Sequence, residues 1–160
     1  MGHRVQVGHG MNSIKTDQNG KQPVAVLIWR LVPALLAWAC DVFLTLLGQP
    51  ADYWQVSYTL ADEANVIARP LLMVGPWAFV ALALAEIIVV ALCVRFTPPK
   101  LAKWLAIAVT LAHTIGACAW LIKRGGWWWI GCIVLMAIIA EVGGRCWRVV
   151  RIQDDGTRCA

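Results

Sequence analysis

Long apolar runs separated by short polar stretches dominate this chain of 160 residues. Each run approaches the ~20 residues that an α-helix needs to cross ~30 Å of hydrocarbon. The runs are continuous rather than alternating, which favours helices over a membrane β-barrel. The pattern therefore predicts an all-α, polytopic membrane protein with a four-helix transmembrane bundle, built from Val24–Leu47, Leu71–Arg95, Leu101–Ile122 and Trp127–Gly143.

Polar segments on either side of the apolar region define the expected domains. Residues 1–22 are polar and lack the apolar core of a signal peptide, so we expect a cytoplasmic polar tail. Residues 23–145 are expected to form the transmembrane domain, with an outer loop over 48–69, and residues 146–160 a basic cytoplasmic tail. With 60% hydrophobic and 14% charged residues, the chain is too apolar for an ordinary soluble domain.

Lysine and arginine are unevenly distributed between the predicted loops. Of the 14 basic residues, all but Arg69, Lys123 and Arg124 fall in the two tails, near the inner helix ends or in the second connection. The positive-inside rule then predicts a multi-pass protein of the cell inner membrane with both termini in the cytoplasm. The net charge of +5 reflects this topology and contact with anionic lipid, and it does not indicate nucleic-acid binding.

Catalytic and cofactor motifs are absent from the sequence. The six cysteines are scattered without a Cys-x-x-Cys pair, and there is no His-Glu-x-x-His or Gly-x-Ser-x-Gly. We therefore expect neither an enzyme nor a bound cofactor. The lipid bilayer is the expected partner, and helix surfaces rich in Gly and Ala are compatible with a homo-oligomer or a larger membrane complex.

Two ionisable residues of the apolar runs, Asp41 and His113, lie at matched depth. An ionisable side chain inside a membrane costs at least ~2.5–3.5 kcal/mol on insertion scales, so each needs a partner or a function. At 1.5 Å per residue, Asp41 lies about 9 Å and His113 about 13 Å below the outer ends of their helices. We expect them to meet at hydrogen-bond distance, directly or through one water, in an outer-leaflet polar site. Such a site fits a helix-packing pair, ion or proton chemistry, or a small polar ligand or lipid head group.

Two further carboxylates, Glu86 and Glu141, are expected in the inner half of the bundle. Glu141 precedes Arg145 by four residues, which predicts an ion pair on one helical face. Glu86 has no such local partner and needs a neighbouring helix or protonation. If the two glutamates face one another, they form a second polar layer that resembles a proton relay.

The outer connection from Gly48 to Arg69 is aromatic in its first half and acidic in its second. The first half is expected to lie at the membrane interface through Tyr53, Trp54, Val56, Tyr58 and Leu60. Asp62 is interpreted as an N-cap of a helix that begins near Ala64. We expect Glu63 and Asn65 at the mouth of the polar site. Asn65 is predicted to be buried and bonded to the first helix near Asp41 or Thr45, with Arg69 neutralising Glu63 or Asp62.

The segments Asp41-Val-Phe-Leu-Thr45 and Glu63-Ala-Asn65 carry a resemblance to a known family. They resemble the Asp-x-x-x-Thr and Glu-x-Asn-Pro motifs of small four-helix prokaryotic membrane proteins grouped as domain of unknown function 5658. Val66 stands here in place of the last proline. The resemblance covers about the first half of the chain. It implies the four-helix architecture and singles out Asp41, Thr45, Glu63 and Asn65, without implying an activity.

Three function classes follow from these observations: an accessory or ligand-binding membrane protein, a carrier and a membrane-embedded enzyme. The missing motifs disfavour the enzyme. The sequence favours an accessory or ligand-binding protein whose candidate ligand or ion-binding residues are Asp41, Thr45, Glu63, Asn65 and His113. The alternative is an ion, proton or metal carrier that acts as an oligomer, because four helices alone do not enclose a pathway.

Overall fold

The computed structural model describes residues 24–158, and residues 1–23 and 159–160 lie outside the described part, as does the predicted tail over 1–22. The described chain is helical, without a strand. Four of its helices are long and apolar enough to cross a membrane, which confirms the predicted fold class. The long helices are α1 (Val24–Gly48), α4 (Pro76–Phe96), α5 (Pro99–Lys123) and α6 (Trp128–Arg158), and the short elements are α2 (Ala51–Gln55), η1 (Tyr58–Leu60) and α3 (Ala68–Val74).

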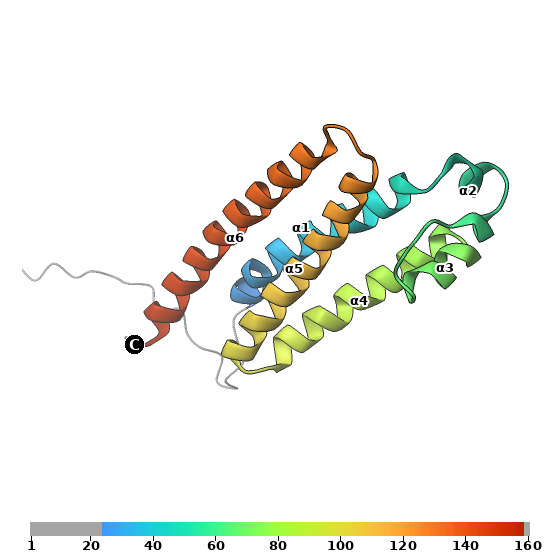
Figure 1. Cartoon of the computed structure of the whole chain (residues 1–160). Coiled ribbons are helices and arrows are strands. Elements are labelled where there is room, and N and C mark those ends of the chain that lie inside the picture. The colour runs from blue at the N-terminus through green and yellow to red at the C-terminus, as the bar shows by residue number, and fades with distance from the viewer. Residues whose placement is uncertain (1–23, 159–160) are drawn as a thin grey trace, which may run out of the picture.

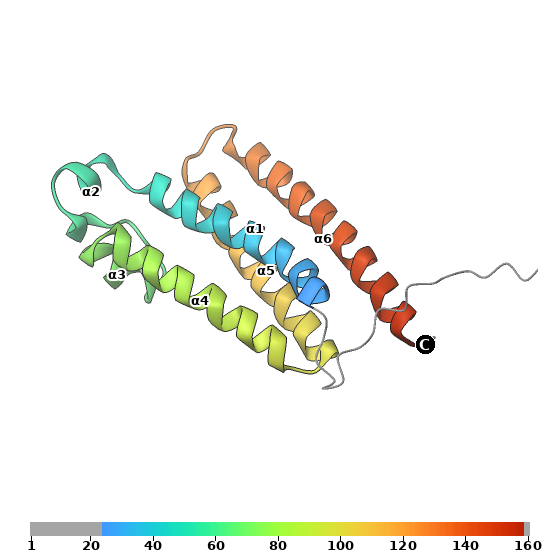
Figure 2. The ribbon, with the colours of Figure 1, turned by 180° about the vertical axis from the view of Figure 1, so that it is seen from behind.

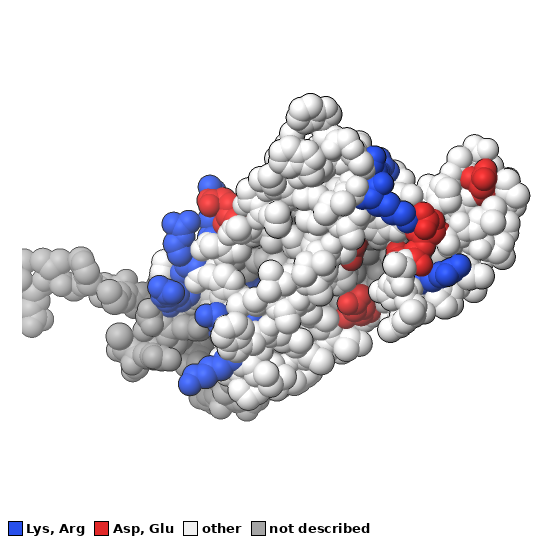
Figure 3. Space-filling view, in the orientation of Figure 1, with Lys and Arg blue, Asp and Glu red and all other residues white. Residues whose placement is uncertain are grey.

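The four long helices run up and down as a bundle (Figure 1). Helix α1 begins and α6 ends at the same end, which we call the terminal end, whereas α2, α3 and the α5–α6 turn lie at the other, the loop end (Figures 1 and 2). Helices α1 and α5 each contact both α4 and α6 as well as one another, so they form the centre of the bundle. Figure 3 shows most of the visible Lys and Arg side chains at the terminal end and a smaller basic group at the loop end, with a largely uncharged zone along the helices between them.

Small residues pack the inside of the bundle and large ones cover its surface. Five alanines on α1 and α5 are almost completely buried: Ala34, Ala37, Ala102, Ala106 and Ala117. Small side chains let the backbones of membrane helices approach closely. Most of the large apolar side chains are exposed instead, which is the pattern expected for helices whose outer faces contact lipid.

The second predicted span begins later than its apolar run, because Gly75 separates α3 from α4. Gly75 has φ of 149°, a backbone conformation that L-residues rarely adopt, and a Cβ there would lie 2.8 Å from Trp77 Nε1. Pro76 then occupies the first turn of α4. Backbone N–H groups in the first turn have no acceptor within the helix, so the missing N–H of proline costs no hydrogen bond there. The expected start at Leu71 was therefore wrong, since Leu71 belongs to the short helix α3.

The fourth helix is longer than predicted. It was expected to end at Gly143, but α6 continues through Gly143 and Gly144 to Arg158, so the segment expected as a tail begins as helix. Neither glycine adopts the left-handed conformation that would end a helix. Each glycine costs ~1 kcal/mol relative to alanine in a helix interior, and α6 continues through both.

The outer connection folds onto the bundle around one buried tyrosine. Tyr53 is fully buried, and its hydroxyl donates a 3.1 Å hydrogen bond to the Leu72 carbonyl of α3. Its ring packs with Ala68, Leu72 and Phe79, so Tyr53 is covered by protein. Burial, together with the nearby Tyr58, raises the pKa of Tyr53, which keeps the phenol protonated as a donor.

Candidate functional site

Three ionisable side chains from three helices converge within the bundle. Asp41 comes from α1, Glu86 from α4 and His113 from α5. His113 Nδ1 lies 2.8 Å from Asp41 Oδ2, and His113 Nε2 lies 3.2 Å from Glu86 Oε1. The predicted contact between Asp41 and His113 is therefore present as a direct hydrogen bond, and the imidazole also bridges to a second carboxylate. We call this group the Asp41–His113–Glu86 cluster.

Glu86 lies in this cluster, not in an inner polar layer as expected. Counted from Pro76, where α4 begins, Glu86 lies about 15 Å along its helix. His113 lies the same distance, about 15 Å, from the loop end of α5, so the two residues share one level. Glu141 instead accepts a 2.7 Å hydrogen bond from Arg145, as its spacing predicted. The proposed facing of Glu86 and Glu141 was wrong, because each has another partner.

Hydrogen-bond chemistry sets the proton content of the cluster. An ionised carboxylate only accepts hydrogen bonds, whereas a neutral imidazole has one donor and one acceptor nitrogen. Two nitrogen–carboxylate contacts therefore require either a doubly protonated His113 between two carboxylates, or a neutral ring with one protonated carboxyl group. Both arrangements carry one net negative charge and contain two protons, which is one more than a neutral imidazole between two carboxylates holds. The three groups share this additional proton.

A glycine on α5 provides the space for the Asp41 carboxylate. A Cβ at Gly116 would lie 2.6 Å from Asp41 Oδ1 and 2.8 Å from Oδ2, closer than real Cβ contacts. Gly116 follows His113 by three residues and therefore lies on the same helical face. The spacing of three residues between His113 and Gly116 could have indicated this role from the sequence.

The cluster lies at one wall of a cavity of about 320 Å³ between α1, α4 and α5. The rest of the lining is mainly apolar, with Asn65 at the loop end: Val42, Asn65, Ile67, Ala68, Phe79, Leu82 and Ala83. The His113 side chain is 13% exposed, Asp41 22% and Glu86 48%. Glu86 lines the cavity and is thus the most exposed member of the cluster.

Asn65 lines the cavity as an exposed turn residue and not as the buried amide that we predicted. Its Oδ1 accepts hydrogen bonds from the backbone N–H groups of Ile67 at 2.9 Å and Ala68 at 3.4 Å, at the start of α3. The carboxylate of Glu63 accepts from the backbone N–H of Asn65 at 2.7 Å. Both side chains therefore order the turn and do not bond to α1. Thr45 is buried in α1 and does not line this cavity.

Asp62 anchors the outer connection to the neighbouring helix. Its carboxylate pairs with Lys123 at the end of α5, and its backbone N–H donates a 2.9 Å bond to the Gln49 side chain. The predicted roles of Asp62 as an N-cap and as a partner of Arg69 were wrong, because Asn65 supplies the cap and Lys123 the charge. The turn that carries Asn65 is thereby fixed over the cavity.

Metal binding has little geometric support within the described residues. No group of three or more His, Cys, Asp or Glu side chains there is arranged to hold a metal ion. The two carboxylates contact opposite nitrogens of the imidazole, so they do not converge on one point as metal ligands would.

The fold and the cluster define a polytopic four-helix membrane protein with an ionisable centre between three of its long helices. Comparison of the chain with protein-family models, with curated proteins and with solved structures returned no match.

Proposed function

We propose that this protein is a ligand-binding membrane protein, rather than an enzyme, and that it takes up a small organic cation with an apolar body from the outer side. The observation that carries the proposal is His113 held between two carboxylates at the wall of a mainly apolar cavity. A volume of about 320 Å³ suits a small molecule.

The charge of the site supports a cation as ligand. The cluster carries one net negative charge in surroundings of low dielectric constant, where attraction for a positive charge is stronger than in water. An ammonium group at Glu86 neutralises that charge, while the side chains of Val42, Ile67 and Leu82 cover an apolar body. An inorganic ion would use the negative charge but not the apolar side chains.

Binding of the cation is coupled to the shared proton. An ammonium group that donates to Glu86 replaces the hydrogen bond from His113, so the cluster can release its proton on binding. The ionisable groups that line the cavity are Asp41, Glu86 and His113. For one released proton, linkage predicts an affinity that rises about tenfold per pH unit over the range in which the proton is lost.

The positive-inside rule supports an outward-facing cavity. Basic side chains gather at the terminal end (Figure 3), which favours that end as the cytoplasmic one. The loop end, with Asn65 and α3, then faces the outside of a cell inner membrane.

Thermal unfolding of the detergent-solubilised protein tests this proposal, with n-butylammonium chloride as probe and n-butanol as its neutral control. At one hundred times its dissociation constant, a ligand stabilises the folded protein by about 2.7 kcal/mol. We expect n-butylammonium to raise the melting temperature. Glu86→Gln and Asp41→Asn should each raise the n-butylammonium concentration needed for the same shift at least about tenfold. The matched control is Glu141→Gln, because Glu141 pairs with Arg145 away from the cavity. An equal response to n-butanol, or equal responses of the Glu86 and Glu141 variants, refutes the proposal.

A carrier that acts as an oligomer is the second candidate. It is favoured by the exposure of Glu86, whose side chain is 48% accessible halfway along an apolar helix whose other charged residue, Arg95, lies in the last turn. Liposomes that contain the protein and a pH-sensitive dye distinguish the two functions. Neutral n-butylamine crosses a bilayer by itself and shifts the internal pH, so protein-free liposomes give the background. A carrier moves protons faster than this background when an n-butylammonium gradient is imposed, whereas a binding protein does not exceed it.

A further inference from the structure

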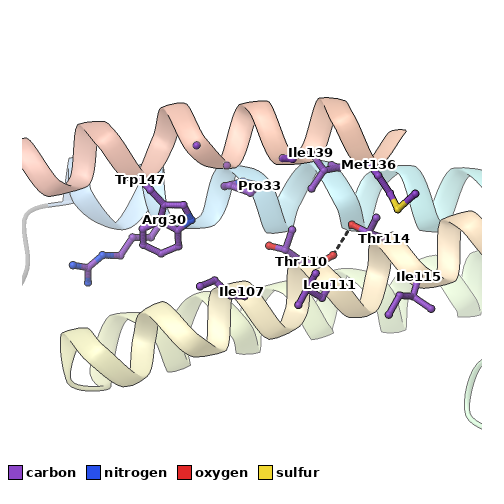
Figure 4. Close-up of a pocket in the computed structure, with 13 residues that line it drawn as sticks. Arg30, Pro33, Ile107, Thr110, Leu111, Thr114, Ile115, Met136, Ile139 and Trp147 are labelled. Carbon is purple, nitrogen blue, oxygen red and sulfur yellow. Dashed lines mark hydrogen bonds between the residues drawn. The ribbon is translucent and has the colours of Figure 1, made fainter. Parts of the chain in front are cut away.

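The outer connection leaves the loop end of the bundle and turns back along α4 before α3 begins. Ile67 and Ala68 line the same cavity as Leu82 of α4, and α3 packs against α4 on its way to Gly75 (Figure 1). We call residues 62–74 the returning segment. A second cavity, a groove of about 400 Å³ between α1, α5 and α6 (Figure 4), shares no residue with the first, so the returning segment does not border it.

Two counts of helical rise place the turn before α3 at the same depth. Helix α3 rises about 9 Å from Ala68 to Val74, and Leu82 lies about 9 Å along α4 from Pro76. From Pro76 to Phe96, α4 spans about 30 Å, which equals the thickness of the hydrocarbon core and places Pro76 at its boundary. The turn therefore lies about 9 Å inside a leaflet that contributes ~15 Å.

The tip of the returning segment is apolar and is not covered by protein. The side chains of Val66 and Ile67 are 84% and 66% exposed. In water, two neighbouring side chains of this kind are unfavourable, whereas acyl chains at the same depth offer them an apolar environment. Arg69 follows in the first turn of α3, and an arginine side chain is long enough to extend toward the head groups.

Backbone N–H groups around the turn are paired within the chain. The N–H of Asn65 donates to the Glu63 carboxylate at 2.7 Å, and those of Ile67 and Ala68 donate to Asn65 Oδ1. The N–H of Arg69 donates to the Asn65 carbonyl at 2.9 Å. Non-helical backbone at membrane depth is tolerated where it is buried in protein or lines a cavity, because hydrocarbon offers no hydrogen-bond partner. The turn fits this requirement, since Asn65 lines the cavity.

We propose that the returning segment is re-entrant within the leaflet at the loop end, and that Val66 and Ile67 at its tip contact the acyl chains of that leaflet. A soluble partner at the loop end would not reach this depth, so the position of the tip favours lipid. The inference goes beyond the proposed function, because it holds with or without a bound cation and for either orientation of the bundle.

Site-specific photocrosslinking of the full-length protein in dioleoylphosphatidylcholine vesicles tests the proposal. The photoreactive residue p-benzoylphenylalanine replaces Val66, and mass spectrometry with fragmentation measures the adducts on acyl chains. Ile88 is the positive control, because it is 58% exposed and lies about 18 Å along α4 from Pro76. Val56 is the matched control, since it is a 73% exposed valine of the same connection that directly follows α2, beyond the end of α1 (Figures 1 and 2).

The three positions should give different yields of acyl adducts. We expect the yields at Val66 and Ile88 to agree within about twofold, because both side chains contact hydrocarbon. The yield at Val56 should be at least about fivefold lower, because this residue lies beyond the helix ends.

A second measurement does not depend on the bulky photoreactive residue. In phosphatidylcholine nanodiscs, Val66→Asp should lower the melting temperature by at least about 4 °C more than Val56→Asp, because a carboxylate at membrane depth is costly. The proposal is overturned if Val66 gives as few acyl adducts as Val56, if Val66 crosslinks to a second copy of the chain instead of lipid, or if the two aspartate variants melt at the same temperature.

Discussion

Replacing Gly116 by Ala places a methyl group in the space that the Asp41 carboxylate occupies. The added Cβ would lie 2.6 Å from Oδ1, 2.8 Å from Oδ2 and 2.9 Å from Cγ of Asp41. The carboxylate cannot yield easily, because its Oδ2 is 2.8 Å from His113 Nδ1. The substitution should therefore break this hydrogen bond or separate α1 from α5.

Helix propensity and packing predict opposite signs for this substitution. In an open helical position, Gly→Ala stabilises by about 1 kcal/mol. At Gly116 this gain is opposed by about 1–3 kcal/mol for overpacking and about 1.5–3 kcal/mol for a hydrogen bond to a charged group. The clash should therefore leave a net destabilisation of about 1.5–5 kcal/mol.

Equilibrium unfolding in mixed micelles measures this difference. Gly143→Ala is the control, since a Cβ there meets nothing within 4 Å, and it should stabilise by about 1 kcal/mol. In a double-mutant cycle, Asp41→Ala should relieve much of the cost of Gly116→Ala, with a coupling energy of about 1–3 kcal/mol. If Gly116→Ala is as stable as Gly143→Ala, or if the two substitutions are additive, the argument that Gly116 makes room for Asp41 is wrong.

Three further predictions concern the outer connection and the topology. Tyr53→Phe leaves the buried Leu72 carbonyl without its donor and should lower the free energy of unfolding by about 1–3 kcal/mol. Chemical denaturation measures this loss, and a smaller value contradicts the burial argument. Asn65→Ala removes the cap of α3 and should lower stability by about 0.5–2 kcal/mol, whereas Asn65→Asp retains the acceptor and should melt close to the wild type. A reporter that is active only in the periplasm, fused at the C-terminus, should give no signal, and strong activity would reverse the proposed orientation.

The sequence alone determined the architecture and part of the site. Apolar runs of membrane length require helices, because a helix satisfies its backbone polar groups internally. Two side-chain contacts were also predictable, one between helices and one within a helix. Asp41 and His113 lie at similar depth, and Glu141 and Arg145 are four residues apart on one helical face. Each inference needs only the rise per residue and the helical period, both of which are properties of a single helix.

Tertiary structure alone decided which side chains join that pair. Depth along a helix gives the height of a residue but not its rotation about the axis, so the partner of Glu86 could not be derived from spacing. The level of Glu86 also depended on the break at Gly75, which is visible in the sequence as Gly-Pro but was read as part of one span. Once α4 begins at Pro76, Glu86 and His113 stand at equal depth.

The roles of Asn65 and Tyr53 depended on long-range packing. An amide before a helix can cap that helix or bond to a neighbour, and the choice follows from how the connection docks. Here the Tyr53 hydroxyl bonds to α3, and Asp62 pairs with Lys123. These two contacts hold the connection in a position where the Asn65 side chain accepts from the backbone N–H of Ile67 instead of bonding to α1. Local pattern thus determined the helices, whereas the clustering of ionisable groups and the position of the outer connection arise only when helices distant in sequence pack against one another.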